Sequence, residues 1–193
     1  MYANGISSTP TEKPEFKPVS AILLTQNESI DVLGSKTAGE VEFVLFRAED
    51  EFYVTVGADH ADRVLEALQS SFAKQVCAKP IALYAWPLAE ALPHWDQLRM
   101  RSEVIINGQS MLYQDDSVAF LMHPTAILDV IQARHFPLDN GCAYFCGTLL
   151  MKNNSFQFGE AYKICLSDPV LNRSIEHRYS VAILKKDVSY IRI

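Results

Sequence analysis

The sequence predicts a mainly β (α+β) fold in which short strands dominate and a few helices lie outside them. Three observations lead to this prediction. Most apolar runs are short and rich in β-branched and aromatic residues, some neighbouring runs are joined by turn signals, and only two stretches show helical spacing. The 193 residues are 49% hydrophobic, which is enough for one buried core.

The predicted strands follow one another with few interruptions. Residues 47–50, "RAED", favour a hairpin turn between two of them, and Asn107-Gly108 is the strongest hairpin signal in the chain. Strands are expected at residues 19–25, 29–34, 40–46, 51–58, 80–86, on both sides of Asn107-Gly108, and at 143–150, 156–166 and 178–185.

Two helices are expected between these strands. The first covers residues 62–72, where the apolar side chains fall on one helical face: Val64, Leu65, Leu68 and Phe72. The second begins near Pro124, a residue favoured in the first helical turn, and buries Ile127, Leu128 and Ile131.

The domain organisation is simple. Residues 1–18 hold three prolines and no periodic apolar pattern, so we expect an extended N-terminal arm, followed by a single domain over residues 19–193. The polar start lacks the apolar stretch of a secretory signal, and no apolar run has the roughly 20 residues of a membrane helix. We therefore expect no membrane association.

Charge and cysteine usage narrow the expected class further. The net charge of −6, without a basic patch, argues against a nucleic-acid-binding protein. The four cysteines form no Cys-x-x-Cys pair and no zinc-type group with histidine, so we expect them to be reduced and mostly buried. Reduced thiols favour a cytoplasmic location.

An unusual group of acids lies at residues 40–62. Glu40 and Glu42 alternate along one strand and so share a face, and Asp59 follows the next strand. In one interpretation the glutamates occupy a solvated strand end, and Asp59 caps the helix that follows, with Asp62 in its first turn. In the other, the three carboxylates bind a hard cation such as Mg²⁺, Mn²⁺ or Ca²⁺. Spacing alone favours the first.

The order of these pieces resembles the catalytic C-terminal domain of the fumarylacetoacetate hydrolase family, over roughly residues 20–185. "GEVEFVLF" matches the family's Glu-x-Glu strand, and "GADHADR" supplies Asp59 and Arg63. Lys79 in "CAKPIA" matches the site lysine, and Lys74 is a weaker candidate for that role. "INGQSMLYQ" is similar to the family's Asn-Gly-x-x-x-Gln hairpin, and Gly147-Thr148 match its Gly-Thr.

The resemblance implies a mixed β-sandwich roll and a homodimer. It also implies a divalent-cation enzyme acting on a small 2-oxo or 1,3-dicarbonyl acid by C–C bond hydrolysis, decarboxylation or dehydration. Glu40, Glu42 and Asp59 are then the metal ligands, and Lys79 stabilises the negative charge that develops on a substrate oxygen. Arg63, Gly147 and Thr148 are the implied substrate-binding residues.

The sequence departs from the family pattern in three places. Family hydrolases activate water with a His/Glu pair upstream of Glu-x-Glu, whereas the first histidine here is His60. Ala58 stands where the family has asparagine, and Leu149 replaces the proline after Gly-Thr. His60 is a candidate stand-in base, since imidazole titrates near neutrality. The alternative is a catalytically silent relative that binds a metal or a small acid without turnover.

A second charged segment, "LPHWDQLRMRS", admits two interpretations. Arg99 or Arg101 could hold a substrate carboxylate through the planar guanidinium group. Otherwise the segment is a turn in which Trp95 is buried and the charges are solvated, and this second interpretation is the favoured one.

Overall fold

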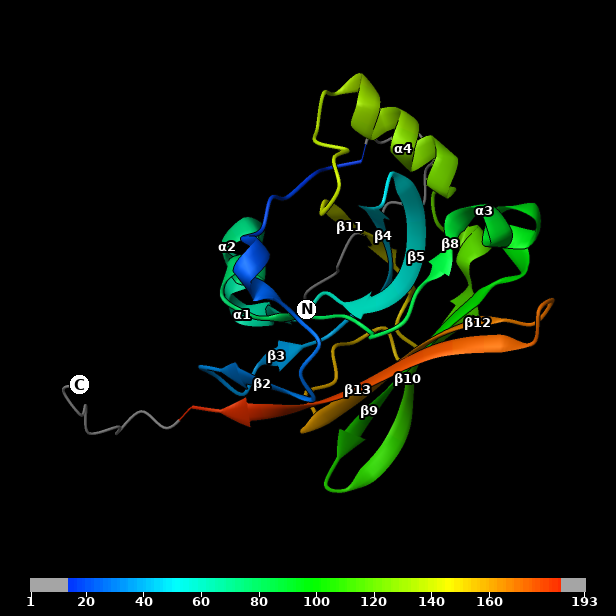
Figure 1. Cartoon of the computed structure of the whole chain (residues 1–193). Coiled ribbons are helices and arrows are strands. Elements are labelled where there is room, and N and C mark those ends of the chain that lie inside the picture. Colours follow the sequence, from blue (N-terminus) through cyan, green and yellow to red (C-terminus); the bar gives the residue numbers. More distant parts are fainter. Residues whose placement is uncertain (1–13, 185–193) are drawn as a thin grey trace.

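Two β-sheets face each other in the computed structural model, which describes residues 14–184 (Figure 1). One sheet has five strands in the order β10-β9-β12-β13-β2, and the other has four in the order β11-β4-β5-β8. The mainly β, α+β class is therefore confirmed. The five-stranded sheet comprises β2 (Ser29–Val32), β9 (Arg99–Ile106), β10 (Gln109–Ser117), β12 (Ala161–Asp168) and β13 (Arg173–Ile183). The four-stranded sheet comprises β4 (Val41–Ala48), β5 (Glu51–Ala58), β8 (Trp86–Pro87) and β11 (Ala143–Thr148).

Short elements connect and flank the sheets. Two further strand pairs are present, the parallel pair β1-β7 and the antiparallel pair β3-β6. Figure 1 shows α4 beyond one end of the four-stranded sheet and α1 with α2 at its side. The remaining elements are β1 (Leu24–Thr25), β3 (Thr37–Ala38), β6 (Ala61–Asp62), β7 (Lys79–Pro80), α1 (Arg63–Glu66), α2 (Ser70–Gln75), α3 (Leu88–Ala91) and α4 (Pro124–Ala133), with 3-10 turns at Ala21–Leu23, Leu92–Gln97 and Val118–Phe120.

The main core lies between the two sheets. Phe43 of β4 is fully buried and meets the Trp95 ring edge-on, with 5.0 Å between ring centroids. Burying one such side chain contributes about 1.5–3 kcal/mol. Trp95 is only 2% exposed, and Arg99 and Arg101 both pair with Asp115 on the neighbouring strand, Arg101 at 3.6 Å. The turn interpretation is confirmed for the burial of Trp95 and the exposure of the two arginines, but Arg99 and Arg101 lie on β9 rather than in the turn.

Both predicted hairpin turns are confirmed. β4 and β5 are joined by Glu49 and Asp50, with φ of 51° and 63°. β9 and β10 are joined by Asn107 and Gly108, with φ of 52° and 74°. Two central residues with positive φ give a turn whose twist matches that of the paired strands. The β4–β5 register set by the first turn extends without interruption to Val41 and Ala58.

Three predicted strands differ in extent. The strand expected at residues 156–166 begins only at Ala161. In residues 19–25 only Leu24 and Thr25 form a strand, after a 3-10 turn. In residues 80–86, Pro80 pairs with β1, Ile81 makes a single bridge to Gly57, and Trp86 pairs with β5, while residues 83–85 are not paired as a strand. The Thr55 hydroxyl donates to the carbonyl of Tyr84 at 2.6 Å and so ties this stretch to β5.

The first helix prediction is wrong in extent and orientation. The segment forms two short helices, and its apolar side chains face outward, with Val64 60%, Leu68 81% and Phe72 63% exposed. Arg63 faces inward instead, because its guanidinium group pairs with Glu40 at 3.0 Å. Asp62, not Asp59, caps α1 by accepting from two backbone N–H groups. The second helix is confirmed as α4, with Ile127 and Ile131 buried.

The predicted N-terminal arm lies mostly outside the described residues. Within residues 14–18, Phe16 packs on Phe136 with 4.7 Å between ring centroids, and Arg134 donates to the Pro14 carbonyl at 2.6 Å. All four cysteines are free, and Cys77 is the buried one. Among residues 14–184, no helix combines the length and apolarity needed to cross a membrane.

Candidate active site

Three acids lie on one face at one end of the β4–β5 pair, and we call Glu40, Glu42 and Asp59 the carboxylate cluster. Glu40 and Asp59 lie opposite each other just beyond the paired strands, with backbone N–H···O distances of 3.4 and 2.9 Å. Glu42 lies opposite Gly57. Opposed residues of an antiparallel pair share a face, so the three carboxylates lie on the same face of the sheet.

The carboxylate cluster is surrounded by cations. Glu40 pairs with Arg63 at 3.0 Å, while Asp59 pairs with Lys74 and lies 3.4 Å from the Lys79 ammonium. Asp59 is 4% and Glu42 6% exposed. Burial of the Asp59 charge is tolerated because two ammonium groups lie beside it.

Glu42 is held by the backbone of β11. The Gly147 N–H donates to its carboxylate at 2.7 Å, at the point where the β11 register shifts. Gly147 has a φ of +94°, a conformation that favours glycine. Burial raises the pKa of Glu42 to about 7, although the Lys74 charge and the Gly147 hydrogen bond oppose the shift.

Thr148 and Gln114 bind the backbone at the start of β4, next to Glu42. The Thr148 hydroxyl donates to the carbonyl of Val41 at 2.8 Å and accepts from Gln114. Gln114 is fully buried and also binds the backbone of Val41 and Leu149. In this structure the two predicted substrate-binding residues, Gly147 and Thr148, therefore position Glu42 and its strand. Gln114 was not among the predicted site residues, although it is the glutamine of the hairpin motif.

Lys79 is the most buried amine near the cluster. Its side chain donates to the carbonyls of His60 at 2.5 Å and Cys77 at 3.0 Å. Burial lowers the pKa of Lys79 to about 7, and the charges of Lys74 and Arg63 add to the effect. Lys79 can therefore carry or release a proton near neutral pH.

His60 lies elsewhere. Its ring is fully buried and contacts Tyr162 and Tyr179 edge-on, and Nδ1 is 3.1 Å from the Tyr179 hydroxyl. Burial lowers the pKa of His60 to about 3, so the ring is neutral. Although His60 adjoins Asp59 in sequence, its ring packs among tyrosines.

Arg63 is engaged within the protein. One guanidinium nitrogen contacts Glu40 and Glu66, and the other donates to the carbonyls of Ala38 and Asp59 at 2.8 and 3.2 Å. The group also stacks over Phe156 at 4.3 Å. Here Arg63 clamps the ends of the strands that carry the carboxylate cluster.

The carboxylate cluster has the right chemistry for a hard divalent cation, since three carboxylates offer oxygen ligands. Asp59 Oδ1 is also buried and accepts no hydrogen bond, although the Lys79 ammonium lies 3.4 Å from it. The spacing of the three carboxylates, however, does not match a formed metal site: over residues 14–184, no three His, Cys, Asp or Glu side chains are grouped so as to hold a metal ion. The donor atoms are of the type that binds a divalent cation, but the ammonium groups of Lys74 and Lys79 lie beside Asp59.

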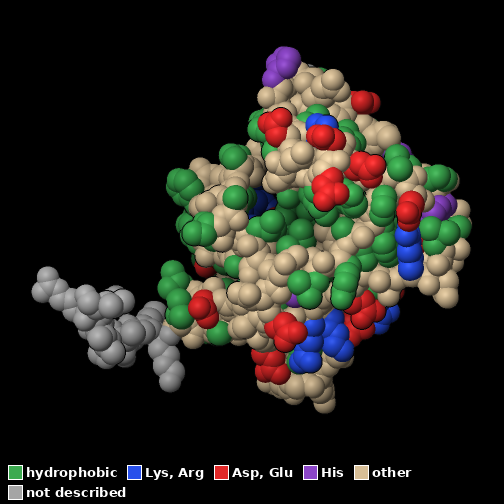
Figure 2. Space-filling model, in the orientation of Figure 1, with side chains coloured by type: hydrophobic (Ala, Val, Ile, Leu, Met, Phe, Trp, Pro, Cys, Tyr) green, Lys and Arg blue, Asp and Glu red, His purple; other side chains and the backbone are tan. Residues whose placement is uncertain are grey.

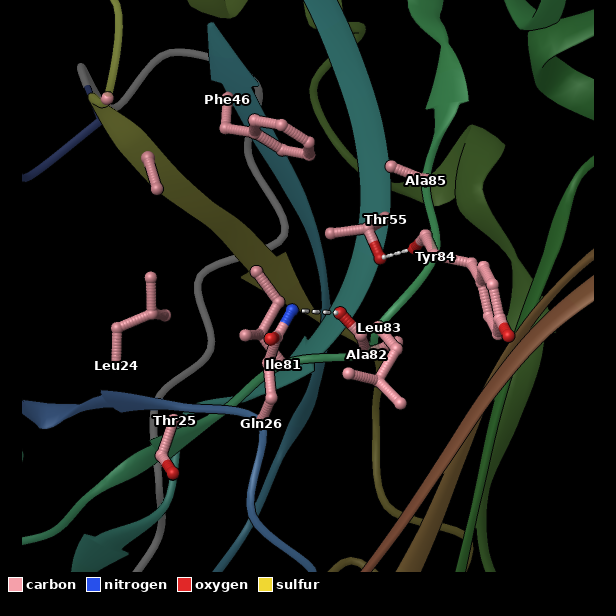
Figure 3. Close-up of a pocket in the computed structure, with 12 residues that line it drawn as sticks. Leu24, Thr25, Gln26, Phe46, Thr55, Ile81, Ala82, Leu83, Tyr84 and Ala85 are labelled. Carbon is pink, nitrogen blue, oxygen red and sulfur yellow. Dashed lines mark hydrogen bonds between the residues drawn. The ribbon is translucent and has the colours of Figure 1, made fainter. Parts of the chain in front are cut away.

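A pocket of about 400 Å³ opens on the same sheet face, farther along β5 (Figure 3). Figure 2 shows a hollow on this side of the molecule with hydrophobic side chains across its floor. We call it the apolar pocket. Its lining residues include Leu24, Gln26, Phe46, Thr55, Ile81 and Ala143.

A wall over Gly57 separates the apolar pocket from the carboxylate cluster. A Cβ atom on Gly57 would lie 2.6 Å from the Phe145 ring, 2.9 Å from Val44 and 3.0 Å from the Pro80 carbonyl. These groups fill the space between Thr55, in the pocket, and Asp59, in the cluster. The lining of the apolar pocket includes none of the three acids, and the two sites are neighbours on one sheet face.

Known structures share this architecture. Structures of Cg1458 match with a TM-score of 0.62 at 18% identity, covering 81% of this chain and 64% of theirs. 2-Keto-3-deoxy-D-arabinonate dehydratase, complexed with magnesium and 2,5-dioxopentanoate, matches with 0.62 at 14%, covering 83% and 59%. A 5-carboxymethyl-2-hydroxymuconate delta-isomerase from Mycobacterium smegmatis matches with 0.61 at 15%, covering 83% and 65%. These likenesses support a fumarylacetoacetate-hydrolase-like fold.

The chain itself belongs to the family described as protein of unknown function (DUF2848), whose model matches residues 5–179. No curated protein matches it. The chain spans less than two thirds of the length of the solved structures named above.

Proposed function

We propose that this protein is a divalent-cation-dependent enzyme acting on a small 2-oxo or 1,3-dicarbonyl acid. One observation carries the proposal: the carboxylate cluster lies on one face of the β4–β5 pair with the buried amine of Lys79 beside it. The fold adds support, because the dehydratase complex pairs this architecture with magnesium and a dioxo acid. Mg²⁺, Mn²⁺ and Ca²⁺ all accept such ligands.

In this proposal Glu40, Glu42 and Asp59 hold the cation. When bound, a divalent cation supplies a Lewis acid that orients two substrate oxygens and stabilises negative charge next to the reacting carbonyl. Lys79 supplies a second positive charge and a proton, fixed in place by the His60 and Cys77 carbonyls. Its pKa of about 7 suits proton transfer at neutral pH. C–C bond hydrolysis, decarboxylation and dehydration all use this combination.

The second candidate is a catalytically silent relative that binds a cation or a small acid. Two observations favour it. His60 is neutral and enclosed by tyrosines. Arg63, Gly147 and Thr148 also make their contacts within the protein.

Two measurements test the proposal. Mn²⁺ at a hundred times Kd is expected to add about 2.7 kcal/mol to the free energy of unfolding of the native protein and nothing to that of Glu42→Ala. The Mn²⁺-loaded protein is then assayed against a panel of 2-oxo and acylpyruvate acids. Cation-dependent turnover of any of them supports the enzyme. Binding of these acids without turnover supports the silent relative, and equal stabilisation of both proteins would refute the cation site.

We also propose a homodimer of this chain. Large apolar side chains are exposed beside α1 and α2, including Ile22 at 87% and Leu68 at 81%. Figure 2 shows hydrophobic side chains gathered over this part of the surface. Burial of such side chains drives association. Sedimentation equilibrium is expected to give twice the chain mass for the native protein and the chain mass for Leu68→Glu, and a monomeric native protein would contradict the proposal.

A further inference from the structure

Lys74 reaches the carboxylate cluster from a short helix at the surface of the molecule. It lies in α2, a helix of six residues in which Ala73 is the buried residue. Phe72 and Val76, beside it, are 63% and 48% exposed. The Lys74 ammonium nevertheless pairs with the Asp59 carboxylate, and its charge also acts on Glu42.

The three cations around the cluster are held differently. Arg63 is fixed by the carbonyls of Ala38 and Asp59, and Lys79 by those of His60 and Cys77. The contact that the structure gives for the Lys74 ammonium, within residues 14–184, is the Asp59 carboxylate. Lys74 is therefore the cation that can leave without breaking backbone hydrogen bonds.

We propose that the Lys74 ammonium competes with the divalent cation for the Asp59 carboxylate, and that the Lys74 side chain turns away from Asp59 when the cation binds. The inference rests on the proposed function and adds a competition to it. A divalent cation on Asp59 and Glu42 and an ammonium group in contact with Asp59 repel each other strongly in a buried site. Both cannot occupy the carboxylate cluster, so cation binding and release of Lys74 are one event.

A turn of the Lys74 side chain leaves α2 in place: Ala73 stays buried, and Gln75 Oε1 still accepts from the Ser20 N–H at 2.9 Å. The Lys74 side chain can turn outward because it is already 19% exposed. Lys74 thus neutralises the acids while the cation is absent and lowers the affinity of the cluster for the cation.

The test compares Mn²⁺ binding to three proteins by isothermal titration calorimetry: native, Lys74→Gln and Lys152→Gln. Lys152 lies in an exposed turn, so its substitution changes the net charge equally without touching the cluster. Lys74→Gln is expected to bind Mn²⁺ on the order of tenfold more tightly than the native protein, because the competing charge is gone. Lys152→Gln is expected to match the native protein.

A second measurement uses the native protein alone. Lysine acylation by an amine-selective reagent is followed by mass spectrometry with and without Mn²⁺. Labelling of Lys74 is expected to rise several-fold with Mn²⁺, because loss of the ion pair frees the amine, while that of Lys152 stays constant. This measurement decides the question if Lys74→Gln fails to fold.

The outcomes separate the two proposals. Equal Mn²⁺ affinity of the native protein and Lys74→Gln, or Lys74 labelling that ignores saturating Mn²⁺, overturns the competition and leaves the proposed cation enzyme standing. Failure of all three proteins to bind Mn²⁺ overturns both.

Discussion

The carboxylate cluster and the apolar pocket lie on the same face of the same strands, yet they are built in opposite ways. The cluster is closed, and each acid in it is met by a cation or a backbone N–H. The pocket is open, and polar groups such as Thr55 and Gln26 bond to backbone carbonyls at its edge (Figure 3). Volume alone would select the pocket as the functional site. Charge, burial and shifted pKa values select the cluster, and such groups collect where chemistry occurs.

The two sites are therefore expected to respond differently to substitution. A buried group of mutually balanced charges is sensitive to any change in one member, because the others are left unpaired in a poorly solvated site. An open apolar surface tolerates substitution with smaller consequences. Substitutions on the two sides of the Gly57 wall therefore test whether the sites are separate.

The largest effect is expected for Glu42→Gln in the cation-free protein. Burial raises the pKa of Glu42 from 4.5 to about 7, so the folded state prefers the neutral acid. The stability from this preference is fully present below pH 4.5 and is lost as the pH rises through about 7. At pH 8 the variant is expected to be more stable than the native protein by up to about 3 kcal/mol, because the glutamine cannot ionise.

Urea unfolding at pH 8 and pH 4.5 measures this effect, with Glu176→Gln on the exposed face of β13 as control. The gain is expected to vanish at pH 4.5 and to be absent in the control. A variant less stable than the native protein at pH 8 would show that Glu42 is held as an anion by its neighbours.

The next effect is catalytic. With cation present, Lys79→Met is expected to lower kcat/KM on the order of a hundredfold, because one preorganised charge is removed from the reacting centre. Lys163→Met, an exposed position on β12, serves as control. A drop of less than about threefold in a folded Lys79→Met protein would remove Lys79 from the mechanism. Circular dichroism establishes that the variant is folded.

A smaller effect is expected at the wall itself. A Cβ atom at residue 57 would overlap the Phe145 ring, the Val44 side chain and the Pro80 carbonyl. Gly57→Ala is therefore expected to lower the free energy of unfolding by about 1–3 kcal/mol, the usual cost of overpacking. Gly34→Ala is the matched control, because its Cβ would meet only Asp62 Oδ2, at 4.0 Å. Equal urea midpoints for the two variants would mean that the groups around residue 57 move aside and accommodate the added methyl group.

The sequence predicted the parts of this comparison that depend on strand register. Alternation along residues 40–46, the turn at 49–50 and the length of residues 51–58 together place Glu40, Glu42 and Asp59 on one face. These features are local, and the structure preserves them. The fold class followed for the same reason, since hairpin turns and alternating patterns are encoded over few residues.

Other parts depend on contacts that no local pattern contains. The outward apolar face of residues 63–76 results from Arg63 pairing with Glu40, a contact between two segments more than twenty residues apart. The family motif favours Lys79 over Lys74 as the site lysine. The place of Lys74 beside Asp59 depends on how α2 folds back, which the motif does not contain. His60 adjoins Asp59 in sequence, and only the tyrosines of β12 and β13 reveal where its ring goes.

The smallest effect is expected in the apolar pocket. Ala143→Trp fills part of its lining from β11, where residue 143 is exposed and pairs with Phe46. Because Val44 and Phe145 stand between this position and the acids, the Mn²⁺ affinity is expected to stay within about twofold of the native value. Calorimetric titration measures it. Substitutions that share no partners act independently, so a tenfold change in Mn²⁺ affinity would show that the pocket and the carboxylate cluster are coupled. A constant affinity together with a raised KM for the acid substrate would instead assign the pocket to the part of the substrate that does not react.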